Sequence, residues 1–438
     1  MTDHLLDPAP GERPWTRLHP LSPLLHFGRA IAVVAAVFLP RMANPLLHEG
    51  HDVPWPEMVG GAGLVLTGFV SWLVTRWRVS HGELQIETGL IRRQSIRVPL
   101  RRVQAIDIVR PLLGRILGLA ELRIALAGTG SSSSRLAYLT EERAHEVRAE
   151  LLALGAGLAG DTPVPSERRI VSVDFWTLLA SVVCSATAAV VTAVVIAVAV
   201  AAVLTGSPLL VLGIGWPILL TAGAAMARQL NAEYGFTVAE APDGLRLRSG
   251  LLSTRAETVP IGRVQAVRWI SPVLWRAFGW HRLEIDVARQ RLSAGGEHEG
   301  GHLSSALLPV GSEHDAATLL ARVLPGTHVT PPPGSQPPWR AMWRAPLSYR
   351  NLRAWHDDTY VWTRTGRLRP TVTIVPLAKV QSLRWVQGPV QRRLRLATVH
   401  VDTAGRGWHA VAYARDQDEA DLLLWRLTEL SRSARRPA

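Results

Sequence analysis

The sequence predicts a polytopic membrane protein with four transmembrane α-helices in two hairpins and three cytoplasmic modules, each of antiparallel strands closed by a C-terminal helix. Three observations lead to this fold class: long apolar segments, arginines at one end of each of them, and a threefold internal repeat. The 438 residues are 47% hydrophobic and only 19% charged, a balance typical of chains with membrane segments. A chain of this length also exceeds one ordinary core, so several domains are expected.

The apolar segments lie in two pairs. Residues 173–204 carry no charge beyond their second residue and exceed the roughly 20 residues that a helix needs to cross a bilayer. Residues 209–227 are long enough to return, which predicts a hairpin with a short turn. Residues 24–40 and 58–74 predict the other hairpin, although Arg29 shortens the first of these segments.

Arginine placement orients the predicted helices. Arginines precede the first and third segments and follow the second and fourth, whereas the loop at 41–57 holds one arginine beside three acidic residues. The positive-inside rule therefore places both termini and all three modules in the cytoplasm, on the inner face of a bacterial membrane. No cleavable signal peptide is expected, because the first twenty or so residues are polar and contain proline.

The repeat is clearest in the stretches that begin "VPLRRVQAIDI", "VPIGRVQAVRW" and "VPLAKVQSLRW". We interpret their shared residues as structural, because valines at strand positions belong to a core and proline in a sheet marks an edge or a bulge. The signature residues are Val98, Pro99, Val103 and Gln104; Val259, Pro260, Val264 and Gln265; and Val375, Pro376, Val380 and Gln381.

Each copy runs through several strands and ends on an amphipathic helix, as Ser312 and Asp315 indicate by forming a capping-box pattern in the second copy. The third copy lacks a preceding apolar pair and follows a proline-rich linker instead. The predicted organisation is an N-terminal tail (1–23), hairpin 1 (24–75), module 1 (76–158), a linker (159–172), hairpin 2 (173–228), module 2 (229–325), a proline-rich linker (326–345), module 3 (346–432) and a basic tail (433–438).

The Val-Pro-Leu/Ile and Arg/Lys-Val-Gln pattern, followed by Pro111, Pro272 and Pro389 in the three copies, resembles the bacterial pleckstrin-homology (PH) domains of the YdbS/YdbT type (bPH2, formerly a domain of unknown function). The resemblance covers most of the chain. It implies a PH-like β-barrel with a C-terminal helix in each module, and membrane hairpins joined to such domains are typical of that family. It implies no catalytic activity and no cofactor.

Arginine clusters are the candidate lipid-binding residues. The formal net charge is +13, which favours anionic partners such as the phospholipids of the inner leaflet, where each basic residue near the surface adds roughly 1 kcal/mol. The alternative is that long arginine stems only solvate polar strand faces. The candidates are Arg92, Arg93, Arg97, Arg101 and Arg102 in module 1, Arg246, Arg248 and Arg255 in module 2, and Arg392, Arg393 and Arg395 in module 3.

These patterns predict a non-enzymatic protein that docks on anionic lipid headgroups or on a protein partner, such as a second PH-domain membrane protein, in an envelope-maintenance role. A scaffold that assembles only through protein contacts is the main alternative. Nucleic acid is not an expected partner, because the basic residues are not interleaved with stacking aromatics as in RNA-binding modules.

Two other functions, a metal-dependent hydrolase and a transporter, are weaker. The segment His298–His302, "HEGGH", has the spacing of zinc hydrolases, but its glycines oppose the helix that such a site needs, so no metal is expected. A transporter is not favoured, because the apolar segments hold no ionisable residue near their middles. The single Cys184 excludes an internal disulfide and a cysteine metal cluster.

Overall fold

The computed structural model describes the chain in two compact units. Unit 1 comprises residues 1–165, 252–257 and 290–294, and unit 2 comprises residues 166–251, 258–289 and 295–438. The described residues are 15–17, 73–80, 83–88, 94–99, 103–126, 134–155, 168–207, 211–241, 244–288, 306–327, 334–405 and 409–435.

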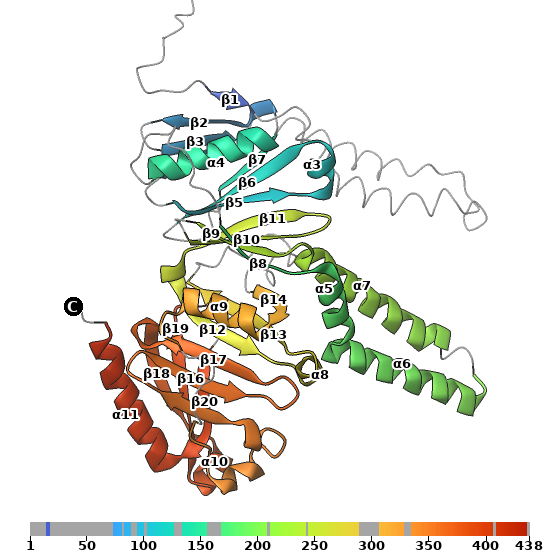
Figure 1. Cartoon of the computed structure of the whole chain (residues 1–438), viewed down its shortest axis with the longest axis vertical. Coiled ribbons are helices and arrows are strands. Elements are labelled where there is room, and N and C mark those ends of the chain that lie inside the picture. Colours follow the sequence, from blue (N-terminus) through green and yellow to red (C-terminus); the bar gives the residue numbers. More distant parts are fainter. Residues whose placement is uncertain are drawn as a thin grey trace, which may run out of the picture. The chain divides into compact units, whose positions relative to one another are not determined.

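Unit 1 holds the strands and closing helix of module 1 (Figure 1). Its first sheet runs β1-β2-β3-β4 in chain order, and β5, β6 and β7 form a second antiparallel set. The elements are β1 (Thr16–Arg17), β2 (Arg76–Ser80), β3 (Glu83–Thr88), β4 (Gln94–Pro99), β5 (Val103–Arg110), α3 (Leu112–Ile116), β6 (Leu119–Leu126), β7 (Ser134–Thr140) and α4 (Glu141–Gly155).

A strand of the second repeat also belongs to unit 1. Within β11 (Thr254–Val259), Thr254 pairs with Arg110 and Ala256 pairs with Ile108, so the start of β11 runs antiparallel to β5. The chain therefore contributes a piece of its second copy to the sheet of its first.

Unit 2 begins with β8 (Arg168–Ser172) and then a helical hairpin. Helix α5 (Phe175–Val183) is followed by α6 (Ala186–Thr205), a π-helical turn (Val211–Gly215) and α7 (Trp216–Glu233). The residues predicted as one long helix are thus two helices, because the backbone at Ser185 is extended and its side chain caps α6 by accepting from the Ala188 N–H at 3.1 Å.

Helix α6 has 20 residues, which span about 30 Å at 1.5 Å per residue and match the hydrocarbon thickness of a bilayer. Within the described ranges it is the one helix long and apolar enough to cross a membrane. The four predicted spans are therefore not confirmed as a set, since residues 24–72 of hairpin 1 lie outside the described part of the chain and α7 does not reach the same length and apolarity.

The remaining elements of unit 2 build modules 2 and 3. Their strands are β9 (Thr237–Ala241), β10 (Gly244–Ser249), β12 (Val264–Ile270), β13 (Trp280–Val287), β14 (Ala306–Ser312), β15 (Arg353–His356), β16 (Tyr360–Thr365), β17 (Thr371–Pro376), β18 (Val380–Val386), β19 (Leu396–Thr403) and β20 (Ala410–Asp416). Their α-helices are α8 (Val273–Arg276), α9 (Glu313–Val323), α10 (Pro389–Arg393) and α11 (Gln417–Ser433), with 3₁₀ turns at Ile261–Arg263, Trp339–Trp343, Tyr349–Asn351 and Leu377–Lys379.

Modules 2 and 3 share a sheet. Six antiparallel strands follow the order β14-β13-β12-β17-β16-β15, of which the first three belong to module 2 and the last three to module 3 (Figure 1). The junction is the pairing of β12 with β17, where Val267 lies opposite Ile374 and Ile270 lies opposite Thr371. The resulting sheet has twice as many strands as either module contributes.

In modules 2 and 3 the repeat signature forms the turn between the first set of strands and the second. Val259, Val264, Val375 and Val380 are all at most 3% exposed. Pro260 and Pro376 each precede a one-turn 3₁₀ helix that changes the chain direction before β12 and β18. Proline suits this position because its fixed φ begins a helical turn and its missing N–H removes no ladder bond.

Each closing helix buries one apolar stripe, as the sequence predicts. In α9 the buried residues are Ala316, Leu319, Leu320 and Val323, which repeat at helical spacing. The predicted capping box is confirmed, since the Ser312 hydroxyl accepts from the Asp315 N–H at 3.2 Å and the Asp315 carboxylate accepts from the Ser312 N–H at 3.3 Å.

Gly244→Ala should destabilise unit 2. Gly244 has φ +136°, and a Cβ there would lie 2.3 Å from the Val259 carbonyl oxygen. Such strain costs about 1–3 kcal/mol, which thermal unfolding of the purified chain will report as a lower Tm. Gly262→Ala is the matched control, because a Cβ at Gly262 meets nothing within 4 Å. Equal Tm values for the two variants would contradict the steric argument.

Candidate membrane-coupling site

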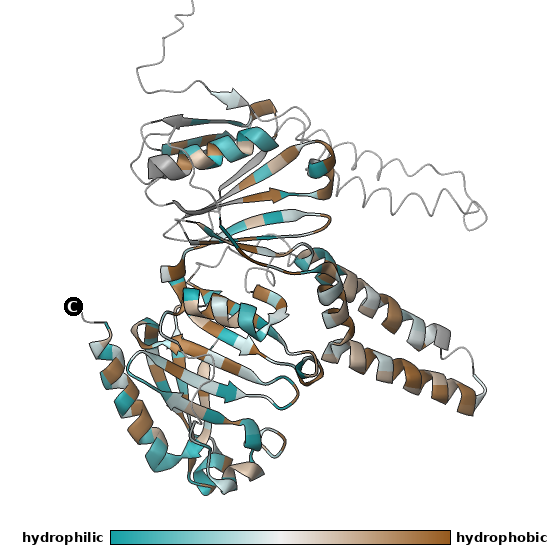
Figure 2. Ribbon diagram, in the orientation of Figure 1, coloured by the Kyte–Doolittle hydropathy of each residue, from teal (hydrophilic) through white to brown (hydrophobic). Residues whose placement is uncertain are grey.

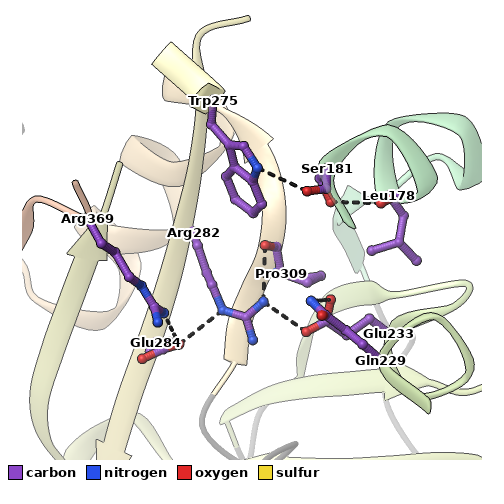
Figure 3. A network of polar contacts seen from close by, with 9 residues as sticks. All are labelled: Leu178, Ser181, Gln229, Glu233, Trp275, Arg282, Glu284, Pro309 and Arg369. Carbon is purple, nitrogen blue, oxygen red and sulfur yellow. Dashed lines mark hydrogen bonds and ion pairs between the residues drawn. The ribbon is translucent and has the colours of Figure 1, made fainter. Parts of the chain in front are cut away.

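The break between α5 and α6 is bonded to module 2. The Ser185 N–H bonds to the Val182 oxygen at 3.2 Å, so the Ser181 carbonyl loses the partner that a continuous helix would give it. Trp275 of α8 donates its indole N–H to that Ser181 oxygen at 3.0 Å (Figure 3). A side chain from the module thus satisfies a backbone acceptor that the helix break exposes.

Apolar packing surrounds this hydrogen bond. Trp275 forms a buried cluster with Leu178 of α5 and Val310 of β14. Leu230 of α7 packs against the same cluster. Both helices of the hairpin are therefore held against module 2 where they leave the apolar segment.

A buried ion-pair network fastens the end of α7. Glu233, whose side chain is 5% exposed, accepts from the Arg282 Nη1 of β13 at 2.8 Å. The Arg282 Nε donates to Glu284 at 3.0 Å, and Glu284 also accepts from Arg369 at 3.3 Å (Figure 3). The network runs from the hairpin through module 2 to the turn before β17 of module 3.

The network stabilises the charge of Arg282. Burial alone would lower the pKa of the Arg282 guanidinium, but the charges of Glu233 and Glu284 outweigh it and raise that pKa above its ordinary value. Gln229 supports the pair by donating to Glu233 at 3.3 Å. Because the Glu233 side chain is out of water, removing Arg282 would leave a buried carboxylate without its charged partner. Removing Glu233 would leave Arg282 with one carboxylate in place of two.

Aromatic residues gather at the same end of the hairpin. Phe175 contacts Trp176 and Tyr234 edge-on, with ring centroids 5.2 and 5.7 Å apart. On the module side Trp280 stacks on Phe278 at 4.6 Å. Tryptophan and tyrosine are enriched at membrane–water interfaces, where their rings meet headgroups.

The end of module 2 formed by α8 and the residues after it also exposes apolar side chains. Val273, Leu274 and Phe278, in and just after α8, are 43%, 46% and 56% exposed. This end is held from module 3 as well, because the Val273 N–H bonds to the Leu368 oxygen at 3.0 Å. Figure 2 shows that hydrophobic residues follow much of α6 and parts of α7. Their large exposed apolar side chains include Val190, Ile196, Val200, Val203, Leu204, Trp216, Leu219 and Leu220.

One exposed arginine lies within the apolar tip, and another lies on α7. Arg276 is exposed on α8, and Arg228 is exposed near the end of α7. We refer to Val273, Leu274 and Phe278 with Arg276 as the α8 tip. Segments that insert into a headgroup layer typically combine apolar side chains with a flanking arginine. The apolar side chains lie below the phosphates, and the guanidinium lies among them.

The other modules place the same one-turn helix at the same point of the repeat. In α3, Leu112, Leu113 and Ile116 are 44%, 44% and 72% exposed, and Arg115 is exposed beside them. In α10, Val390 is 54% exposed and the neighbouring arginines are exposed. The exposed tip is therefore a property of the repeat.

The structure separates the predicted lipid-binding arginines. Arg97 is exposed on β4, Arg248 is exposed on β10 and Arg255 is half-buried on β11. Arg246 is only 6% exposed and does not present its guanidinium to a headgroup. Arg92, Arg93, Arg101 and Arg102 lie outside the described residues.

Three predicted arginines do come together. Arg392 and Arg393 are exposed on α10, and Arg395 follows at the turn after it with φ +49°. They form the basic part of the module 3 tip. Sequence reasoning identified them by their clustering. It did not select Arg276, which has no arginine beside it on α8, and it used Arg228 only to orient the hairpin.

The "HEGGH" segment lies outside the described residues. Within the part of the chain that the structure describes, no group of three or more His, Cys, Asp or Glu side chains is placed to hold a metal ion. Cys184 is a free, half-buried thiol that packs against the cluster around Trp275.

A family model described as bacterial PH domain matches the chain three times, over residues 22–155, 176–325 and 305–430. The chain belongs to the bacterial PH domain family. The resemblance inferred from the repeat signature is thereby confirmed. The first match includes the apolar pair at 24–74 and the second includes most of the pair at 173–227, whereas the third begins one residue before β14 and includes the proline-rich linker. No curated protein and no solved structure matches the chain.

Glu233→Gln should loosen the attachment of α7. Removing one partner of a buried ion pair costs about 3 kcal/mol or more, and here it leaves Arg282 with Glu284 alone. The expected result is earlier chemical unfolding, followed by tryptophan fluorescence of the detergent-solubilised chain. Glu240→Gln is the control: its pair with Arg322 is largely exposed and should contribute less than about 1 kcal/mol. A Glu233→Gln chain as stable as the Glu240→Gln chain would contradict the assigned role.

Proposed function

We propose that this chain is a non-catalytic multi-pass protein of the bacterial cytoplasmic membrane whose PH modules dock on anionic phospholipid headgroups from the cytoplasmic side. The observation that carries the proposal is the α8 tip, which exposes apolar side chains and an arginine while Trp275 ties it to the base of the membrane hairpin. We propose no catalytic activity, because PH modules are generally binding modules and the chain belongs to the bacterial PH domain family.

The lengths of α5 and α6 support a position of the α8 tip at the level of the lipid headgroups. If α6 alone fills the hydrocarbon layer, its first residues mark the cytoplasmic boundary, and α5 then lies at the level of the headgroups. Trp176, which is 69% exposed, fits that level. Because Trp275 bonds to α5, the α8 tip is held at the same level.

The charges support an anionic surface in particular. Arg228 and Arg276 are both exposed near the hairpin base, and each basic residue close to an anionic leaflet contributes roughly 1 kcal/mol. The membrane helices already keep the protein at the bilayer, so these contacts orient module 2 against the surface rather than recruit it.

A scaffold that works through protein contacts is the second candidate function. The observation that favours it is the β12–β17 pairing, in which two modules of this chain are joined edge to edge. The two functions are compatible, because the tip and the sheet edge are different surfaces.

Lipid docking can be tested by measuring the depth of the α8 tip. In a Cys184→Ala chain reconstituted into bilayer nanodiscs, a fluorophore is attached to Phe278→Cys, and quenching by headgroup-labelled lipid is recorded. Strong quenching is expected in anionic bilayers. Arg276→Ala should weaken it there and matter less in neutral bilayers, because the arginine acts through charge.

The matched control is Leu422→Cys on α11, which is also well exposed (61%) and lies on the side of unit 2 away from α5 (Figure 1). It should show weak quenching in either bilayer. Equal quenching at the two positions, or none at Phe278→Cys, would refute lipid docking by the tip and leave the scaffold function.

A further inference from the structure

The chain uses one type of strand junction twice. In each case the first strand of one module's second sheet pairs antiparallel with the last strand of the following copy's first sheet. β5 pairs with β11 in this way within unit 1, and β12 pairs with β17 within unit 2. The junction is thus a repeated feature of this fold.

The two junctions also have the same register. Val109 pairs with Arg255 and Ile270 pairs with Thr371. Val109 and Ile270 each stand five residues after their signature glutamine, and Arg255 and Thr371 each stand four residues before their signature valine. Identical register in strands of different sequence indicates a built-in geometry, because a one-residue slip would turn every side chain to the other face.

The third copy has the same edge without a partner. Strand β18 is equivalent to β5 and β12, but in the described part of the chain it pairs with β19 alone and ends the sheet β18-β19-β20. Such an edge presents a row of backbone N–H and C=O groups that can accept another strand.

Strand β18 is less buried than its equivalent β12, as expected for a strand that lacks a neighbour on one edge. Ile270 of β12 is 2% exposed, whereas Val386, the equivalent residue of β18, is 42% exposed. Trp269 is 9% exposed and its indole N–H bonds to His281 at 2.9 Å. Trp385 is half-buried, and its indole nitrogen has no hydrogen-bond partner among the described residues. The sequence of β18 is therefore as apolar as that of a covered strand, yet it is only partly covered.

The complementary edge lies in module 1. Strand β4 is equivalent to β11 and β17 and ends the sheet β1-β2-β3-β4, where it pairs with β3 alone among the described strands. Among the strands that the structure describes, a single chain thus carries one edge of each type without a partner: β18 of the first type and β4 of the second.

We propose that β18 of one chain pairs antiparallel with β4 of a second copy of this chain, in the register of the two internal junctions. In that register Val386 lies opposite Gln94, and Leu383 lies opposite Arg97. The contact joins unlike edges, so it is head-to-tail, and repetition builds a ring or a row of chains in the membrane. It does not depend on lipid docking.

An arginine in the middle of β18 does not block this pairing. Charged residues often protect sheet edges, and Arg384 occupies the centre of β18. However, Arg268 occupies the equivalent position of β12 and faces Thr373 of β17 in the existing junction. The guanidinium of Arg384 is held over β19 by Asp402, with Nη2 to Oδ1 at 2.9 Å, so it lies along its own sheet.

Cysteine cross-linking tests both the partner and the register. Two full-length chains with different tags, both Cys184→Ala, are co-expressed in the membrane, one with Val386→Cys and the other with Gln94→Cys. Cα atoms of paired residues in an antiparallel ladder lie about 4.5–5.5 Å apart, within reach of a disulfide. Mild oxidation should give a product that carries both tags.

The matched control moves one cysteine by a single residue, from Gln94→Cys to Ser95→Cys. That shift turns the thiol to the opposite face of the strand, so the doubly tagged product should fall at least severalfold. No doubly tagged product from either pair would overturn the proposal. Equal yields from both pairs would also overturn it, because they would indicate random collisions. Val386 is already exposed, so its substitution should leave the fold intact.

Discussion

Backbone pairing between β12 and β17 is the interaction on which the arrangement of unit 2 depends. It joins two sets of three strands into one sheet and places Val267 and Trp269 of module 2 in the same buried cluster as Trp362 and Ile374 of module 3. Arg369 reaches Glu284 only because β17 lies beside β12. The ion-pair network and the support of the α8 tip by Leu368 are consequences of this pairing.

The hairpin is attached to the module by directed bonds as well as by apolar packing. The hydrogen bond from Trp275 to Ser181 and the ion pair of Arg282 with Glu233 each require a defined geometry. Because these groups are buried, leaving any of them without its partner would cost free energy of folding. Module 2 is therefore held at one level and one orientation on the hairpin. A tip held in this way presents the same face to whatever lies beneath it.

The sequence predicts the local part of this structure well. The repeat signature, the capping box at Ser312 and the family follow from residues close together in the chain. The α5–α6 break escapes prediction because residues 173–204 are apolar throughout and Ser185 is an unremarkable residue until its side chain is seen to cap α6. The apolar pattern predicts helix without marking an end, whereas the exposed backbone acceptor at the break is satisfied by Trp275, a residue about ninety positions away.

The candidate site and the shared sheet escape prediction for a related reason. A strand that pairs within its own module and a strand that pairs with the next module carry the same alternation of side chains, so β12 and β18 look alike in sequence. Clustered arginines such as Arg392 and Arg393 are visible in the sequence, but the burial of Arg246 and the approach of Arg276 to the hairpin depend on long-range packing.

The shared sheet also has a consequence for synthesis. β17 leaves the ribosome about a hundred residues after β12, which at roughly 5–20 residues per second leaves the edge of β12 open for about 5–20 s. During that interval the apolar residues of β12 have no covering strand. The order of translation therefore makes the half-finished sheet a natural point of action for a chaperone.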